Sequence, residues 1–222
     1  MQDKLEALRK IQQQVAKKVV LEDRFGAPLE LVAGIDLAFL GNEAIVACVV
    51  MDFPPQRVVE THFLTTVIDF PYVATFLAFR EGPAIVRAIH SPRTSPDIFL
   101  INAHGIAHPL RCGCASHVGV QSGKPTIGVT VSRLYGECSV VPHEEGEATA
   151  LNIGKEQVGW VLRSRIGCKP IFVSPGHLVG LDSSLRIVKA SLCGNKLPEP
   201  MHLAHVLARG VIKRPKAGET EP

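Results

Sequence analysis

Residues 31–40 read LVAGIDLAFL, an apolar stretch that contains one carboxylate, Asp36. The turn signal Gly41-Asn42 follows, and residues 43–52 (EAIVACVVMD) are again mostly apolar, which predicts a β-hairpin. A carboxylate is costly to bury without a partner. Asp36 is therefore interpreted in three ways: as a metal ligand, as the partner of an arginine or lysine, or as a residue at the edge of its strand.

Hydrophobic periodicity predicts the other elements around this hairpin. Strands are expected over 57–67, 97–101, 125–131, 158–162 and 170–173. Helices are expected over 4–20, 71–90 and 114–121, from Gly176-His177 to about 190, and over 200–212. Pro83 is expected to break or kink the second helix. This mixed order predicts an α/β fold in a single domain over 1–222, with residues 213–222 as a frayed tail.

Composition excludes several classes of protein. The chain has 222 residues, of which 46% are hydrophobic, too many for a disordered protein and enough for one core. Apolar runs stay shorter than the ~18–20 residues of a membrane span, and the charged N-terminus does not resemble a secretory signal, so a cytoplasmic location is expected. The six cysteines follow no disulfide framework and are expected to be reduced. A net charge of +3 permits nucleic-acid binding without requiring it.

Polar residues interrupt or follow two of the predicted strands. The strand over 97–101 runs directly into Asn102. Because ligands of open α/β sheets bind at the carboxyl ends of strands, Asn102 and Asp36 can meet if their strands are neighbours. Glu81, in the segment FREGP, is interpreted either as a solvated charge on a helix or as a second carboxylate directed at a metal.

The segment NAHGIAHP (residues 102–109) combines small residues with two histidines. Ala103 and Gly105 would let the backbone approach a ligand closely. His104 and His108 are either loop histidines with satisfied hydrogen bonds or functional groups. His108 precedes a proline, which favours an extended conformation.

Zinc binding and base stacking are two further interpretations. Histidines and cysteines gather over residues 104–117, but Cys112 and Cys114 are separated by one residue and lack a second cysteine pair, which disfavours structural zinc. Tyr72, which follows Pro71, is either a core aromatic or a wedge that stacks on bases. The P-loop, GxGxxG and GxSxG motifs are absent, so nucleotide-triphosphate, dinucleotide and serine-hydrolase functions lack support.

Taken in order, these motifs resemble the endonuclease V family of deoxyinosine 3′-endonucleases. The resemblance covers nearly the whole chain and rests on LVAGIDLAF, PYVATFLAFREGP, INAHGIAHPLRCGCASHVGV, GKPTIGVTVSRL, VSPGHLVGLDSS and KLPEP. It implies a ribonuclease-H-like mixed sheet flanked by helices. It also implies a Mg2+-dependent DNA-repair hydrolase of the deoxyribonuclease V type. Such an enzyme cleaves the second phosphodiester bond 3′ to deoxyinosine and leaves 3′-hydroxyl and 5′-phosphate ends.

The resemblance also implies roles for individual residues. Asp36 and Glu81 would bind Mg2+, or Mn2+ as a substitute, with Asn102 as the third ligand and His108 as a further catalytic residue. Contacts with nucleic acid are expected from Tyr72 as the wedge and from Pro71, His104, Gly105, Arg133 and His177. The expected partners are inosine-containing DNA, or RNA, and downstream repair enzymes that act on the nicked strand. The chain is expected to be a monomer with no membrane association.

Several positions depart from the family pattern. Asn102 stands where the family has an aspartate, and Ala103 replaces the following glycine. Ala74 and Thr75 replace a proline and a glycine after the wedge, and Val131 replaces a lysine, a charge that Arg133 is close enough to supply. A neutral Asn102 adds no negative charge, whereas Mg2+ favours charged oxygen ligands. The alternative function is therefore a catalytically weakened or inactive protein that binds inosine-containing or branched nucleic acid.

Overall fold

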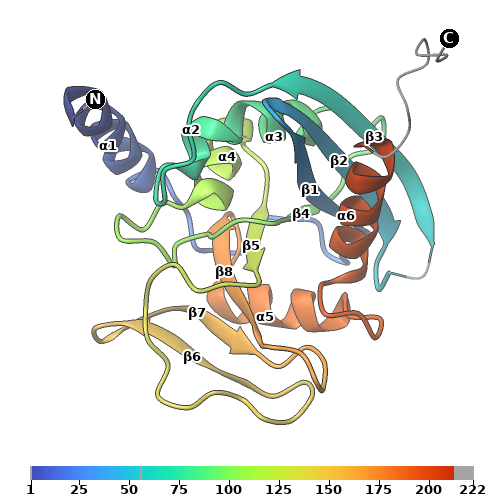
Figure 1. Cartoon of the computed structure of the whole chain (residues 1–222). Helices are drawn as coiled ribbons and strands as arrows, with labels where there is room; N and C mark the ends of the chain where they lie inside the picture. Colours follow the sequence, from blue (N-terminus) through green and yellow to red (C-terminus); the bar gives the residue numbers. More distant parts are fainter. Residues whose placement is uncertain (1, 56, 213–222) are drawn as a thin grey trace, which may run out of the picture.

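Eight strands form one mixed sheet in a computed structural model that describes residues 2–55 and 57–212 (Figure 1). The order across the sheet is β3-β2-β1-β4-β5-β8-β7-β6. Strands β1 (Leu31–Leu40), β2 (Glu43–Asp52) and β3 (Val58–Val67) form an antiparallel meander, and β4 (Ile98–Ile101) and β5 (Thr126–Thr130) continue parallel to β1. Strands β8 (Ile171–His177), β7 (Glu156–Leu162) and β6 (Ala148–Ile153) complete the sheet with antiparallel pairs.

Helices cover both faces of the sheet (Figure 1). On one face, α3 (Gly82–Ile89) and α4 (Cys114–Ser122) pack against a core that includes Ala33 and Ile35. On the other face, α5 (Leu181–Ala190) and α6 (Glu199–Ile212) pack against a core that includes Val32 and Leu100. The short α2 (Leu77–Arg80) precedes α3, and α1 (Gln2–Ala16) projects from the body beside α2 and α4. The predicted α/β class with a mixed sheet between helices is confirmed.

Two predicted helices end or break earlier than their apolar periodicity indicated. Helix α1 ends at Ala16 instead of residue 20, because the backbone of Val20 is bonded to His177 and Leu178 at the end of β8. The helix predicted over 71–90 begins only at Leu77 and is divided at Glu81 into α2 and α3. The break expected at Pro83 is therefore present, and Pro83 itself lies in the first turn of α3, where its missing N–H costs nothing.

The C-terminal half of the sheet also differs from the prediction. Strand β6 was not predicted, and the segment SPGH belongs to β8, so the helix expected from Gly176-His177 starts at Leu181. The proline and glycine suggested a turn, but pairing of His177 with Thr126 in β5 keeps this segment extended. The remaining predicted elements agree with the structure to within about two residues. The tail predicted over 213–222 lies outside the described residues.

No helix among residues 2–55 and 57–212 has both the length and the apolar composition needed to cross a membrane.

A glycine in β1 sets how closely helix α6 approaches the sheet. A Cβ atom on Gly34 would lie 2.2 Å from the carbonyl carbon of Pro200 and 2.3 Å from the amide nitrogen of Met201. No side chain fits at this distance without moving the helix backbone. Residues i and i+2 of a strand point to the same face, so Asp36 shares this face with Gly34. The close packing therefore also sets the distance between Asp36 and α6.

Replacing Gly34 by alanine should force α6 away from β1. We expect Gly34→Ala to lower the free energy of unfolding by about 1–3 kcal/mol, the usual cost of overpacking a core. Urea denaturation measures this change. Gly210→Ala is the matched control, because a Cβ atom there meets nothing within 4 Å. A Gly34→Ala protein as stable as the Gly210→Ala protein would contradict the proposed packing constraint.

Candidate active site

Asp36, in the middle of β1, meets Asn102, which directly follows the last residue of the neighbouring parallel strand β4. Strands β1 and β4 pair with Ile35 opposite Ile101, so the next residue on each chain segment lies beside the other. The Asn102 side-chain Nδ2 donates a hydrogen bond of 2.8 Å to Asp36 Oδ1, and the Asn102 backbone N–H donates to Ile35. The meeting expected for neighbouring strands is therefore observed, and the partner of Asp36 here is an amide.

A histidine from helix α6 holds the other oxygen of the same carboxylate. His205 Nδ1 lies 2.6 Å from Asp36 Oδ2, and the Asp36 side chain is only 4% exposed. Both carboxylate oxygens of Asp36 are thus engaged. The sequence analysis missed His205, because it lies 169 residues from Asp36 and is one histidine among nine. Its only signal is a position beside the buried stripe of α6 formed by Met201, Ala204 and Ala208.

Glu81 is a second buried acidic side chain. It occupies the break between α2 and α3 and is 9% exposed, so the interpretation as a solvated helix charge is wrong. The pKa of Glu81 is raised to about 7, because burial disfavours its charged form more than the positive charge of Arg80 favours it, and the negative charge of Asp36 adds to the rise. The electrostatic influence of Asp36 indicates that the two carboxylates belong to one neighbourhood.

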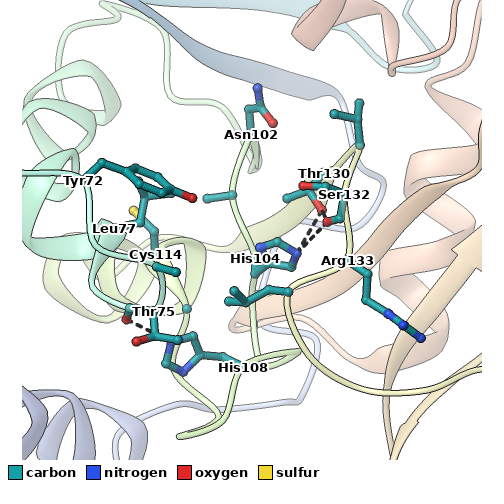
Figure 2. Close-up of a pocket in the computed structure, with 15 residues that line it drawn as sticks. Tyr72, Thr75, Leu77, Asn102, His104, His108, Cys114, Thr130, Ser132 and Arg133 are labelled. Atoms are coloured by element: carbon teal, nitrogen blue, oxygen red, sulfur yellow. Dashed lines mark hydrogen bonds between the residues drawn. The ribbon is translucent and has the colours of Figure 1, made fainter.

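A cavity of about 240 Å3 opens beside Asn102. Four chain segments contribute to it: the loop before α2, the loop after β4, the start of α4 and the turn after β5. Figure 2 shows Tyr72 on one side of this cavity and His104, with Arg133 beyond it, on the other. The lining residues are Tyr72, Ala74, Thr75, Leu77, Asn102, Ala103, His104, His108, Gly113, Cys114, Thr130, Val131, Ser132, Arg133 and Leu134.

His104 is held in a single tautomer at the wall of the cavity. Its Nε2 lies 3.0 Å from the Ser132 carbonyl oxygen and 3.1 Å from Thr130 Oγ1, and the Thr130 hydroxyl itself donates to Ser132. A carbonyl oxygen only accepts, so Nε2 must carry the proton. Burial lowers the pKa of His104 to about 4, which makes the ring neutral near pH 7. Its Nδ1 is therefore an acceptor.

His108 also lines the cavity, but the backbone engages both of its ring nitrogens. Nε2 donates to the Thr75 carbonyl oxygen at 3.0 Å, and Nδ1 accepts the N–H of Leu110 at 3.1 Å. Burial lowers the pKa of His108 as well. In this conformation His108 supports the loop before α2, and neither nitrogen is open to a substrate.

Three other predicted site residues do not line the cavity. Gly105 packs against β8, where a Cβ atom would lie 2.1 Å from the Pro175 carbonyl oxygen, so its small size serves this contact instead of access to a ligand. His177 accepts the backbone N–H of Val20 and ties the segment after α1 to the end of β8. Pro71 lies next to Tyr72 at the protein surface.

Residues 2–55 and 57–212 contain no group of three or more His, Cys, Asp or Glu side chains arranged to hold a metal ion. Cys112 and Cys114 are buried, and burial raises the pKa of the Cys112 thiol to about 12, which disfavours the thiolate that zinc needs. The oxygen ligands available to a cation are the carboxylates of Asp36 and Glu81, together with the amide of Asn102.

Comparison with known proteins confirms the resemblance read from the motifs. The family model of endonuclease V matches residues 13–206. Endonuclease V of Archaeoglobus fulgidus is 40% identical over 212 residues, which cover 95% of each protein. The structure of endonuclease V from Streptomyces avermitilis matches with a TM-score of 0.85 at 34% identity, over 94% of this chain and 92% of that one. Endonuclease V of Ciona intestinalis, solved with a 24mer DNA containing an inosine followed by a ribo-adenosine, matches with a TM-score of 0.84 at 25% identity, over 96% of this chain and 99% of that one.

The raised pKa of Glu81 predicts a specific dependence of stability on pH in the absence of metal. A carboxyl group whose pKa is raised on folding stabilises the protein below its unfolded value, and this stability is lost as the pH rises through the folded value. Between about pH 4.5 and 7 the natural protein should therefore lose stability relative to Glu81→Gln. The difference should reach on the order of 3 kcal/mol above pH 7.

Urea denaturation at several pH values in a chelating buffer measures this difference. Glu6→Gln, which changes an exposed carboxylate on α1, serves as the control and should follow the natural protein. Added Mg2+ should reduce the difference between the natural protein and Glu81→Gln if Asp36 and Glu81 bind the ion. Parallel curves for the natural protein and Glu81→Gln across this pH range would show that Glu81 is not strained by burial.

Proposed function

Because this chain belongs to the endonuclease V family, we propose that it hydrolyses a phosphodiester bond near an inosine in a nucleic-acid strand. The cut falls at the second phosphodiester bond 3′ to the inosine and leaves 3′-hydroxyl and 5′-phosphate ends. The observation that carries this proposal is the hydrogen bond between Asp36 and Asn102 beside the cavity that Asn102 lines, with the buried carboxylate of Glu81 near enough to feel the charge of Asp36. The inosine-containing DNA bound by the Ciona intestinalis relative supports the choice of substrate.

The chemistry of the two carboxylates fits one divalent cation with a preference for oxygen ligands. Asp36 and Glu81 are both buried, and the charge of Asp36 raises the pKa of Glu81. A cation between them would remove this repulsion and favour the ionised forms. We assign the site to Mg2+, with Mn2+ as a substitute. When bound, the ion supplies Lewis-acid stabilisation of the charge that develops on the phosphate.

Two side chains, the amide of Asn102 and the imidazole of His205, orient the carboxylate of Asp36 in this scheme. Asn102 donates to Oδ1 and His205 approaches Oδ2, so the carboxylate plane is fixed from both sides. Asn102 can turn its amide oxygen toward a cation, but it adds no negative charge. His205 remains partly exposed, with 41% of its side chain accessible, while it holds the carboxylate.

The cavity is proposed to receive the hypoxanthine base once it has swung out of the strand. Extrusion costs a few kcal/mol and is easiest for a mispaired base, which favours a deaminated adenine. Tyr72, which is 71% exposed at the edge of the cavity, would fill the space that the base leaves. The Nδ1 acceptor of His104 suits the N1–H of hypoxanthine, because adenine has no hydrogen at N1. Arg133 would contact a phosphate group.

One observation favours a second function, that of a protein that binds inosine-containing or branched nucleic acid without cutting it efficiently. The amide of Asn102 occupies the position beside Asp36 as a hydrogen-bond donor. Only two carboxylates then remain to neutralise a divalent cation, which weakens metal binding before substrate arrives. The cavity and the exposed Tyr72 do not depend on this charge, so binding would persist where cleavage is slow.

A duplex with one inosine tests the proposed reaction directly. With Mg2+ we expect a single nick on the inosine strand at the second bond 3′ to the lesion, and no nick in the matched adenine-containing duplex. Asp36→Ala should abolish the nick, because it removes a carboxylate from the metal site. Denaturing electrophoresis of end-labelled strands locates the cut. No nick at high protein concentration, with Mn2+ as well as Mg2+, would contradict an endonuclease function.

The substitution Asn102→Asp distinguishes the proposed cleavage function from the proposed binding function. The added carboxylate should raise the cleavage rate about tenfold or more, since ~1.4 kcal/mol of extra transition-state stabilisation has that effect. Affinity for the inosine strand should change little, because the cavity is unaltered. Cleavage that is undetectable in the natural protein and appears only in Asn102→Asp would establish the binding function. Equal and rapid cleavage by both proteins would exclude it.

A further inference from the structure

Helix α1 is attached to the rest of the protein in an unusual way. Of the α1 side chains that the structure describes, only Gln12 is buried, with 1% of its surface exposed. The neighbouring apolar residue Ile11 is 43% exposed. A surface helix normally docks through an apolar stripe. On this helix the apolar residues Leu5, Leu8 and Val15 are only half-buried, and the one fully buried side chain among those described is the polar Gln12, which therefore needs a specific partner.

The partner of Gln12 lies in the wall of the cavity. Gln12 Nε2 donates a hydrogen bond of 2.6 Å to the Thr75 carbonyl oxygen, across 63 residues of sequence. The same oxygen accepts the bond from His108 Nε2 at 3.0 Å. Thr75 has a φ of 71°, a conformation that a β-branched residue adopts only when its surroundings hold it there. Two donors from different parts of the chain therefore fix this strained residue.

A second residue of α1 contacts the other end of the same loop. Lys4 Nζ lies 5.8 Å from the centroid of the Phe70 ring, within the range of a cation–π contact. Arg80 holds the same end from the body of the protein, since its guanidinium donates to the Phe70 carbonyl oxygen. Residues 70–75, here called the wedge segment, are thus held by α1 at both ends. Tyr72 lies between these two contacts.

We propose that helix α1 clamps the wedge segment and that Gln12 is a positioning residue, which acts through Thr75 on the placement of Tyr72. The consequence for nucleic acid rests on the proposed function, because it requires Tyr72 to meet the strand. Tyr72 is 71% exposed, so its own contacts do little to order it. Its position is set by the two ends of the wedge segment. A loosened segment must be ordered when the strand binds, and this ordering lowers affinity.

The test compares two neighbouring glutamines in the full-length protein. Gln12→Met keeps the length of the side chain and removes the donor, whereas Gln13→Met makes the same change at an exposed position. Amide hydrogen exchange over the wedge segment and Phe76, measured without nucleic acid, should be about fivefold faster in Gln12→Met only, the effect of one lost neutral hydrogen bond. Lys4→Ala, which changes an exposed side chain and leaves the core intact, should speed exchange at the Phe70 end.

The functional measurement uses a strand that contains one inosine. Gln12→Met should raise the dissociation constant in chelator, and KM with Mg2+, by about fivefold, while kcat stays within about twofold, because Gln12 does not touch the reacting groups. A general loss of folding would instead lower kcat per mole of protein and leave KM unchanged.

Equal exchange rates in Gln12→Met and Gln13→Met would overturn the clamp, whatever the activity. Faster exchange without any change in affinity would overturn the role of the clamp in binding nucleic acid. If the natural protein does not bind the inosine strand at all, the proposed function fails, and hydrogen exchange alone then decides whether α1 clamps the wedge segment.

Discussion

The parallel pairing of β1 with β4 is the constraint on which the candidate site depends. Its register places Asp36 and Asn102 side by side where β4 ends, and their side chains share a hydrogen bond of 2.8 Å. A shift of one residue in this register would turn either side chain to the opposite face. The cores on the two faces of the sheet oppose such a shift, because it would move Ile35 and its apolar neighbours out of the core they fill and into the differently shaped core on the other face. The packing energy of the whole sheet thus maintains the position of one carboxylate.

Charge is the second constraint, since the site concentrates acidic groups where water is scarce. Asp36 is stabilised by an amide and an imidazole, whereas burial raises the pKa of Glu81 to about 7. A buried carboxylate without a cation is an unstable arrangement, and such sites are typical of function rather than of folding. The neutral Asn102 reduces this instability, because it donates a hydrogen bond where an aspartate would repel Asp36. Stability of the metal-free protein therefore favours asparagine at position 102, whereas affinity for a metal ion favours aspartate there.

The wedge segment shows how a surface loop can be ordered without a core of its own. The Thr75 carbonyl oxygen accepts two hydrogen bonds, one from His108 after β4 and one from Gln12 in α1. Both donors are neutral, so the arrangement does not depend on pH near neutrality. The family motif implies a catalytic role for His108, but in the structure both of its ring nitrogens are hydrogen-bonded to the backbone, so His108 supports the wedge segment. The same atom links the cavity wall to the most peripheral helix of the protein.

The sequence by itself determined the α/β class, the hairpin of β1 and β2, and the family, because these depend on local apolar patterns and on motifs read in order. It also singled out Asp36 and Asn102, since polar residues in or beside buried strands are conspicuous, whereas Glu81 was chosen over a solvated helix charge only through the family motif. It did not reveal β6 or the extension of β8 through the segment SPGH, because these depend on pairing with distant strands, whereas the break that Pro83 predicted in the helix over 71–90 is present at Glu81. Only the tertiary structure brought His205 to Asp36 and Gln12 to Thr75, across 169 and 63 residues. The residues around a single histidine or glutamine on a helix do not indicate which distant residue it will contact. These contacts therefore follow only from the tertiary structure.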